Sequence, residues 1–362
     1  MAKVMAANNS MNMIQKGKRA VLLMNLGSPD STSTRDLQTY LMEFLMDKRV
    51  IDYPRLFRKI LVGGIIVPFR AAKSAEAYKT IWTSEGSPLI VLTRQLKEAL
   101  QGQIDEPVEI SMRYGNPTVE EAYRLLLQRM PGLEEVIAVP LYPHYAMASY
   151  ETAVEYAQEV YRKKNYKFRL NFIRPFYNES HYLQALSEHI RPYLREPYDH
   201  ILFSYHGIPA RHIHNSDPTR NHCLYSADCC DVASPAHATC YRHQCFATTK
   251  EMVRLLSIPD GKYSNSFQSR LGKGWLEPFT DIRLEEMPKE GIKNLLIICP
   301  AFVSDCLETL EEIAIRGKET FLGAGGEKYA MIPCLNVDPL WVTALAGWVR
   351  EIAAGNKTMI LD

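Results

Sequence analysis

The sequence predicts an α/β protein with two halves of similar plan, each built around a parallel sheet. Short apolar runs alternate with amphipathic helical patterns along most of the chain, as in parallel sheets that helices cover on both faces. The 362 residues are enough for two domains, and 46% of them are hydrophobic. Two apolar strands also end in similar loops, NLGSP at Asn25–Pro29 and YHGIP at Tyr205–Pro209. This internal match indicates that the two halves repeat one arrangement.

Apolar runs define the strands of the first half. The first run ends at Gly27, Ser28 and Pro29, because glycine and proline interrupt regular structure. Helical periodicity lies between the runs. The predicted strands are 19–26, 108–114, 135–141 and 167–173, and the predicted helices are 34–46, 54–69, 89–103, 119–129 and 151–164.

The second half has a helical pattern at 187–194 and apolar strands at 200–205 and 294–299. Because ligands bind beyond the carboxyl ends of parallel strands, we expect the loops at Gly27, Pro140, His206 and Pro300 to converge on one cleft between the halves. The expected divisions are a disordered tail at 1–17, a first domain at 18–182, a second domain at 183–345 with a cysteine-rich insert at 222–246, and a C-terminal extension at 346–362.

The charge balance and the missing motifs exclude several functions. Lysine and arginine total 42 and aspartate and glutamate total 41, so a nucleic-acid partner held by a basic surface is not expected. No glycine-rich phosphate loop follows a predicted strand, which argues against nucleotide-dependent chemistry. The N-terminal residues lack the apolar core of a signal peptide, so we expect a cytoplasmic protein.

The apolar segment Ile60–Phe69 (ILVGGIIVPF) is too short to span a bilayer, which needs about 18–20 residues. Two interpretations remain open for it. It is either a buried helix, which the residues alone favour, or an apolar lip that dips into a membrane surface between basic flanks. The flanking basic residues are Arg55, Arg58, Lys59, Arg70 and Lys73.

His206 is the first candidate for chemistry. It directly follows an apolar strand and precedes Gly207, so its imidazole is expected at the edge of the sheet. A histidine there can accept a proton or bind a metal near neutral pH. The alternative is a loop histidine without a role.

A row of carboxylates follows the strand that ends at Cys299. Asp305, Glu308 and Glu312 are spaced three and four residues apart, so a helix would place them on one face. Such a row could bind a divalent cation or accept protons. The alternative is an acidic first turn that only favours the helix dipole.

Five of the eight cysteines crowd into 23 residues, with the spacing Cys-x5-Cys-Cys-x9-Cys-x4-Cys. The paired Cys-x2-Cys knuckles of most zinc sites are missing from this spacing. A polar loop would leave free thiols open to oxidation, so we expect four of the five to bind a 2Fe–2S cluster, or less favourably zinc. The five candidates are Cys223, Cys229, Cys230, Cys240 and Cys245.

Several longer motifs resemble those of the ferrochelatase family, in the family's order over about residues 19–350. The resemblance implies two Rossmann-like halves with the active cleft between them. It also implies insertion of ferrous iron into protoporphyrin IX to give protohaem, the last step of haem biosynthesis. The motifs are LLMNLGSPD at 22–30, MRYGNPTVEEA at 112–122, PLYPHY at 140–145, FSYHGIP at 203–209, FQSRLGKGWLEP at 267–278, FVSDCLETLEEI at 302–313 and PCLNVDPLWVTAL at 333–345.

The resemblance assigns roles to individual residues. It makes His206 and Glu308 the catalytic pair, with Asp305 and Glu312 as further ligands of the substrate iron. It turns Ile60–Phe69 into a membrane-facing lip at the inner membrane face, and it allows a homodimer. The residues that it places around the porphyrin are Leu26, Arg70, Tyr78, Ser87, Arg113, Tyr114, Trp275 and Phe302.

Two features depart from the commonest family pattern. Cys306 stands where many members have a histidine between the two acids, which puts any role of that position in doubt. The internal cysteines resemble those of bacterial members with a 2Fe–2S cluster. Two other functions remain open: a chelatase for coproporphyrin, and a non-catalytic haem or porphyrin carrier, which would need neither His206 nor Glu308.

Overall fold

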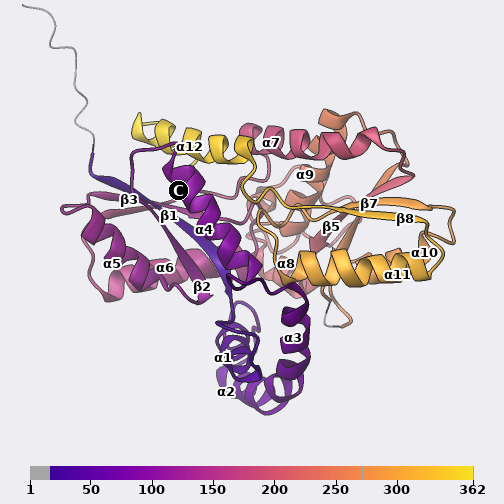
Figure 1. Ribbon diagram of the computed structural model, residues 1–362, viewed down its shortest axis with the longest axis horizontal. Helices are drawn as coiled ribbons and strands as arrows, with labels where there is room; N and C mark the ends of the chain where they lie inside the picture. The colour runs from indigo at the N-terminus through magenta and orange to yellow at the C-terminus, as the bar shows by residue number, and fades with distance from the viewer. Residues whose placement is uncertain (1–16, 271, 362) are drawn as a thin grey trace, which may run out of the picture.

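The computed structural model describes residues 17–270 and 272–361, so the expected tail lies outside the described residues except for Gly17. The described chain forms two four-stranded parallel sheets, ordered β2-β1-β3-β4 and β6-β5-β7-β8 (Figure 1). The same order in both sheets confirms the predicted α/β fold with two similar halves. The strands are β1 (Arg19–Ser28), β2 (Val108–Gly115), β3 (Glu135–Pro140), β4 (Arg169–Phe172), β5 (His200–His206), β6 (Tyr263–Gln268), β7 (Asn294–Ile298) and β8 (Lys328–Ile332).

Helices connect the strands in both halves. Helix α5 begins with a capping box, in which Thr118 and Glu121 each bind the other's backbone N–H. In the first half the helices are α1 (Thr34–Leu45), α2 (Arg55–Ile60), α3 (Val67–Ile81), α4 (Pro88–Gln101), α5 (Val119–Arg129) and α6 (Thr152–Lys163), with π-helical segments η1 (Leu61–Ile66) and η2 (Met147–Glu151). In the second half they are α7 (Ser180–Ile190), α8 (Ala210–Ser216), α9 (Tyr241–Leu256), α10 (Thr280–Glu286), α11 (Lys318–Gly323) and α12 (Pro339–Ala353), with 3-10 segments η3 (Arg191–Arg195) and η4 (Pro235–Ala238) and the π-helical segment η5 (Glu308–Gly317).

The two matching loops occupy matching places. Gly27 lies at the end of β1 beside β2, and Gly207 follows β5 beside β6. A Cβ atom on Gly27 would lie 1.8 Å from the carbonyl oxygen of Tyr114, and one on Gly207 would lie 2.7 Å from that of Gln268. Only glycine allows the backbones to approach so closely, which explains why the sequence repeats it at both positions.

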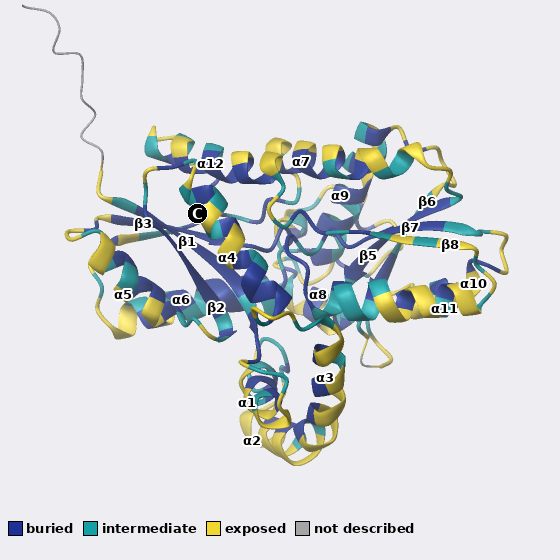
Figure 2. Ribbon diagram, in the orientation of Figure 1, coloured by how far each residue is buried: buried dark blue, intermediate teal, exposed yellow. Residues whose placement is uncertain are grey.

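One hydrophobic core joins the halves. It combines Leu23 of β1 with Phe203 of β5 and with Trp341 and Trp348 of α12. The chain then returns to the first sheet, where the N–H of Leu361 donates to the carbonyl of Phe172 at 2.7 Å. Figure 2 shows the inner strands β1, β3, β5 and β7 as buried along most of their length. The expected domain divisions at 182/183 and 345/346 fall inside α7 and α12 and remain predictions.

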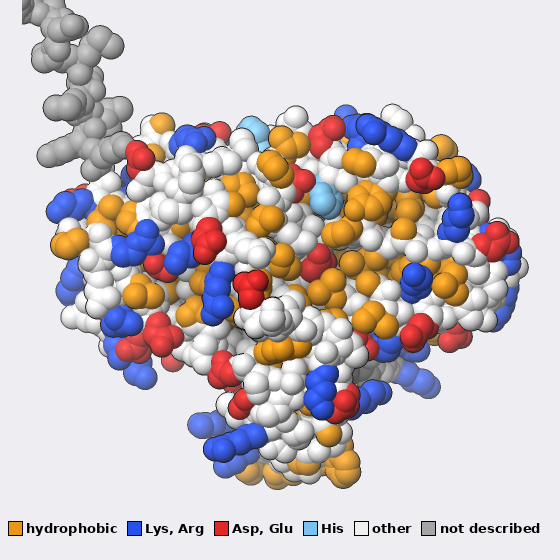
Figure 3. Space-filling model, viewed as in Figure 1, with side chains coloured by type: hydrophobic (Ala, Val, Ile, Leu, Met, Phe, Trp, Pro, Cys, Tyr) orange, Lys and Arg blue, Asp and Glu red, His pale blue; other side chains and the backbone are white. Residues whose placement is uncertain are grey.

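Helices α1, α2, η1 and α3 project from the body of the molecule (Figures 1 and 2). The side chains of Leu56, Ile60 and Phe69 are 73%, 61% and 82% exposed. Val62 and Val67 are buried and anchor the segment. The buried-helix interpretation of 60–69 is therefore wrong, because only a narrow seam of the segment packs inward. Figure 3 shows hydrophobic side chains at the tip of this projection. Among the described residues, none of the helices has the length and apolarity needed to cross a bilayer.

Candidate functional site

His206 ends β5 and remains half-buried, at the edge of the sheet where the sequence places it. Its Nδ1 lies 2.6 Å from the carbonyl oxygen of Gly207. A carbonyl only accepts hydrogen bonds, so Nδ1 carries the proton and Nε2 keeps a free lone pair. The ring of Phe302 lies 6.2 Å from the imidazole. The imidazole is thus set as a proton or metal acceptor at Nε2.

Glu308 and Glu312 lie on η5, where Glu312 interacts electrostatically with both His206 and Glu308. Burial raises the pKa of Glu312, and the charge of Glu308 raises it further. A hydrogen bond from Ser269 lowers this pKa, as does the positive charge that His206 carries when it is protonated. The backbone N–H of Ser269 donates to Glu312 Oε1 at 2.8 Å. The structure therefore brings His206, Glu308 and Glu312 into one electrostatic environment.

Asp305 lies apart from that row. Helix η5 begins at Glu308, so the predicted helical face shared by all three acids is wrong for Asp305. Its carboxylate accepts hydrogen bonds from Thr309 Oγ1 at 2.9 Å, Asn336 Nδ2 at 2.7 Å and the Cys334 N–H at 3.3 Å. These bonds tie the loop before η5 to the loop after β8.

Asp305→Ala is expected to lower the free energy of unfolding by about 3 kcal/mol, because three buried donors lose a charged acceptor. Urea unfolding of both proteins measures the difference. Asp281→Ala is the matched control, since Asp281 is exposed and its ion pair with Arg270 contributes at most about 1 kcal/mol. Equal stability of the two variants would contradict this anchoring role.

Tyr78 is a residue of the first half that interacts electrostatically with Glu308 of the second half. It is buried on α3, and burial, followed by the charge of Glu308, raises its pKa. Its hydroxyl interacts with Ser28, whose Oγ donates to Ser87 Oγ at 2.7 Å. Tyr78 and Ser87 thus converge at the carboxyl end of β1, opposite η5. Arg70 lies on the same helix, exposed to solvent.

Arg113 and Tyr114 are engaged with another partner, Asp47, which the sequence did not indicate. Asp47 Oδ2 accepts from the Arg113 guanidinium at 2.5 Å and from the Tyr114 hydroxyl at 3.0 Å. Arg113 Nε also donates to Thr152 at 2.8 Å. Leu26 packs, half-buried, between the two smaller cores of the first half. Leu26 and Tyr114 thus belong to the same core as Tyr78, and the polar groups of Arg113 and Tyr114 are engaged by Asp47 and Thr152.

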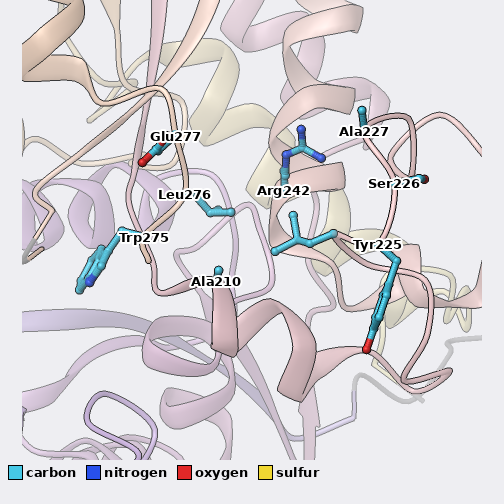
Figure 4. A pocket seen from close by; sticks show the side chains of 9 residues that line it. Ala210, Tyr225, Ser226, Ala227, Arg242, Trp275, Leu276 and Glu277 are labelled. Carbon is cyan, nitrogen blue, oxygen red and sulfur yellow. The ribbon is translucent and has the colours of Figure 1, made fainter. Parts of the chain in front are cut away.

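Trp275 lies beside the second loop of the repeat. It forms a bridge with Pro209, and its ring lies 3.4 Å from the position of a Cβ on Gly207. Trp275 also lines a pocket of about 430 Å³ between its own loop and the cysteine-rich insert. Figure 4 shows Trp275 and Tyr225 at opposite sides of this pocket, with Arg242 of α9 between them. The pocket borders the insert and not the carboxylates of η5.

Four of the five crowded cysteines face one another. Cys230 and Cys223 both share hydrogen bonds with Cys240, and Cys229 lies within charge interaction of Cys223 and Cys230. All are buried, free thiols. Cys245 lies five residues into α9 from Cys240, on another side of the helix, where its thiol contacts Tyr241. Cys245 also interacts electrostatically with Cys240, so its hydrogen bond with Tyr241 is what distinguishes it from the other four.

The surroundings favour a thiolate at one of the four thiols, Cys240. Burial raises the pKa of Cys223, and the hydrogen bond to Cys240 raises that of Cys230. Arg242 approaches Cys229 Sγ at 3.7 Å and Cys230 Sγ at 3.5 Å, and the N–H of Leu224 donates to Cys229 Sγ at 3.3 Å. The hydrogen bond from Cys230 lowers the pKa of Cys240 to about 6.

Within the described residues, no three His, Cys, Asp or Glu side chains surround a single metal position. A 2Fe–2S cluster divides its four thiolates between two irons and does not require such a ring. The four buried thiols of this loop therefore fit a cluster in number and burial.

Three histidines hold the Cys229–Cys230 turn. His222 Nε2 and His237 Nε2 lie 2.7 and 3.0 Å from the carbonyl of Cys229, and His243 Nδ1 lies 2.7 Å from that of Cys230. Each nitrogen must carry a proton to make these bonds. The histidines thus position the turn through its backbone and leave the thiols free to bind.

Sequence reasoning missed several residues that organise the site. Gln268 donates to the carbonyl of Glu308 at 3.0 Å, Ser269 binds Glu312, and Tyr241 donates to the carbonyl of His206 at 2.9 Å. Gln268 and Ser269 lie in a motif that the sequence did single out, FQSRLGKGWLEP. For Tyr241 the only signal was its place directly after Cys240.

Two solved structures resemble this arrangement. SirB from Bacillus subtilis with Fe3+ aligns with a TM-score of 0.53 at 16% identity, over 95% of this chain and all of that one. The sirohydrochlorin chelatase SirB from Bacillus subtilis subspecies spizizenii, in complex with cobalt, aligns with a TM-score of 0.52 at 12% identity, over the same shares. At these identities the likeness defines the fold, which is that of the chelatases.

Sequence comparison is more specific. The ferrochelatase family pattern matches residues 18–353. Ferrochelatase of Opitutus terrae is 48% identical over 336 residues, covering 92% of this chain and 97% of that protein. Ferrochelatase of Pseudomonas fluorescens strain Pf0-1 is 49% identical over 330 residues, covering 90% and 96%. The chain belongs to the ferrochelatase family.

Proposed function

We propose that the protein inserts ferrous iron into protoporphyrin IX to give protohaem, in haem biosynthesis. Its family membership supports this activity. The observation that carries the proposal is the imidazole of His206, whose Nδ1 bond to the Gly207 carbonyl directs Nε2 as the acceptor of the neutral ring. Glu312 interacts electrostatically with this imidazole and with Glu308.

These groups suit the chemistry of metal insertion. Two pyrrole protons must leave the macrocycle, and a neutral imidazole is a suitable base at neutral pH. The raised pKa of Glu312 makes this carboxyl a better proton acceptor than an exposed glutamate. Carboxylate oxygens of Glu308 and Glu312 also offer replacement ligands to ferrous iron as it loses water. Asp305 is already committed to its three hydrogen bonds and is left out of this set.

We propose that the porphyrin lies between α3 and η5. Tyr78, Ser87 and Phe302 line the junction of the halves near Glu308 and His206. Arg70 on α3 would pair with a propionate at the outer edge. Trp275 would close the side next to Gly207.

The activity is tested by mixing the protein with ferrous iron and a porphyrin under anaerobic conditions and measuring the metalloporphyrin formed. We expect turnover of protoporphyrin IX to exceed that of coproporphyrin. Faster turnover of coproporphyrin would favour the alternative chelatase. Tight porphyrin binding without metallation by either substrate would favour the carrier.

We also propose that Cys223, Cys229, Cys230 and Cys240 bind a 2Fe–2S cluster. The mutual contacts of the four thiols and the guanidinium of Arg242 beside two of them support this set. Cys245 is left out of the proposed set because its thiol hydrogen-bonds with Tyr241 on α9. When bound, such a cluster supplies one-electron chemistry and links the insert to α9. The visible spectrum and the iron, sulfide and zinc contents of the isolated protein distinguish the cluster from a zinc ion.

The tip of the α2–η1–α3 projection is proposed to contact the inner membrane from the cytoplasm. Its exposed apolar side chains lie next to exposed basic residues, a combination that suits an anionic lipid surface. Arg58 is an exception among the flanking residues, since its guanidinium is buried and donates to the carbonyls of Ile51 and Tyr53. A homodimer remains a family-based proposal, testable by sedimentation.

Replacing Ile60 and Phe69 by aspartate is expected to weaken binding to anionic vesicles at least about tenfold, because each apolar side chain contributes about 1.5–3 kcal/mol when buried. Co-sedimentation with vesicles measures the loss. Ile282→Asp on α10 is the control, since Ile282 is exposed away from the projection. Similar binding by both proteins would show that the projection does not meet the membrane.

A further inference from the structure

Tyr241 joins the cysteine-rich insert to the candidate base. It is the first residue of α9, directly after Cys240, which caps that helix. Its side chain is buried, and its hydroxyl donates to the backbone carbonyl of His206 at 2.9 Å. A tyrosine phenol is protonated at neutral pH, so the hydroxyl is the donor in this bond. The side chain of Tyr241 therefore links Cys240, a proposed cluster ligand and its neighbour in the chain, to the backbone of His206.

The bond acts at the peptide that fixes the imidazole. On one side of this peptide the His206 carbonyl accepts from Tyr241, and on the other the Gly207 N–H donates to the Gln268 carbonyl at 2.7 Å. The carbonyl of Gly207 then accepts from His206 Nδ1. The bond from Nδ1 to the Gly207 carbonyl selects the tautomer with a free Nε2. A rotation of the peptide between His206 and Gly207 would therefore weaken this bond, and the ring would lose both its fixed orientation and its single tautomer.

Tyr241 has little freedom to move within its surroundings. The ring of His144 packs against it edge-to-face at 6.0 Å, and the thiol of Cys245 lies beside its hydroxyl. A second tyrosine joins the same two elements elsewhere, since the Tyr205 hydroxyl of β5 lies 2.8 Å from Thr249 Oγ1 of α9. That bond does not touch the backbone of His206, so the two links can be separated by experiment.

We infer that Tyr241 is a positioning residue for His206, and that it passes the state of the cysteine insert at Cys240 to the candidate base. This inference rests on the proposed function, because it takes His206 as the base and Cys240 as a ligand. Loss of order at the start of α9 would withdraw the hydroxyl from the His206 carbonyl, and the imidazole would lose its fixed orientation.

Tyr241→Phe tests the link, because it removes only the hydroxyl and keeps the packed ring. We expect kcat for porphyrin metallation to fall about tenfold or more, the usual scale for groups that orient a functional side chain, with KM for porphyrin unchanged. The visible absorption of the cluster should remain. In protein with 15N-labelled histidine, the His206 signal should change from one tautomer to a mixture.

Tyr205→Phe is the matched control and should keep the wild-type kcat and the single His206 tautomer. Equal loss of kcat in both variants would overturn the inference, because general packing of α9 on β5 would then explain the loss. No loss of kcat in Tyr241→Phe would also overturn it, because the hydroxyl would then have no role in positioning His206. Cys240→Ser should reproduce the tautomer mixture, and combining it with Tyr241→Phe should add no further loss; additive losses would remove Cys240 from the link. His206→Ala identifies the NMR signal of His206, because that signal disappears in the variant. It also distinguishes failure of the proposed function from failure of this inference: turnover retained by His206→Ala would overturn His206 as the base, whatever the result for Tyr241→Phe.

Discussion

His206→Ala is expected to reduce iron insertion by about two to four orders of magnitude, the usual range for a positioned acid or base. The variant removes the free Nε2 lone pair that the bond from Nδ1 to the Gly207 carbonyl creates. It leaves the backbone bond from Tyr241 to residue 206 possible, so β5 and α9 should remain in place. Initial rates of metalloporphyrin formation under anaerobic conditions measure the effect.

His181→Ala is the control for this variant, because His181 is exposed on α7 and pairs with Glu179 at 2.9 Å, far from η5 along the chain. It should turn over at the wild-type rate. The spectrum of the cluster should be unchanged in both variants. If His206→Ala retained wild-type turnover, the base would have to be another group, and Glu312 with its raised pKa would be the next candidate.

The strands and the repeat could be predicted because they depend on local pattern. Buried parallel strands require continuous apolar runs, as in β1 and β3, whose side chains are buried almost throughout. The two glycine loops also carry a local signal, because close backbone contact admits no other residue. By contrast, β8 has an exposed edge-strand pattern (KYAMI), and the sequence did not indicate it.

The partners of the candidate site could not be predicted, because they lie far apart in the chain. Asp47 meets Arg113 across 66 residues, and Asp305 meets Asn336 across 31. The spacing of the acids suggested one helical face, but the bonds to Asn336 and Thr309 hold Asp305 in the loop before η5. Tertiary hydrogen bonds thus overrode helical periodicity at that residue. His206 lies at the carboxyl end of β5, and Glu308 and Glu312 lie on η5, the helix that follows β7, so both segments start from the same edge of the second sheet.

The choice among the five cysteines depends on where α9 begins. Cys240 caps this helix and Cys245 is its fifth residue. Five residues are nearly one and a half turns of an α-helix, so the two thiols leave the helix on different sides. Cys240 turns toward Cys223 and Cys230, whereas Cys245 turns toward Tyr241 in the core. The spacing of the cysteines in the sequence made Cys240 and Cys245 equally good candidates for cluster ligands.

Cys240→Ser is therefore expected to abolish the visible absorption and nearly all bound iron, whereas Cys245→Ser should keep both. The serine hydroxyl in the first variant cannot replace a thiolate that lies among three others, while the second variant changes a thiol outside the set. Absorption spectra and iron and sulfide analysis of the two purified proteins, handled without oxygen, measure the difference. Loss in both variants would make Cys245 a ligand and require the start of α9 to rearrange around the cluster. If both variants retained the absorption and the iron, Cys240 would not be a ligand. The candidate ligands would then be the remaining thiols, two of which lie beside Arg242.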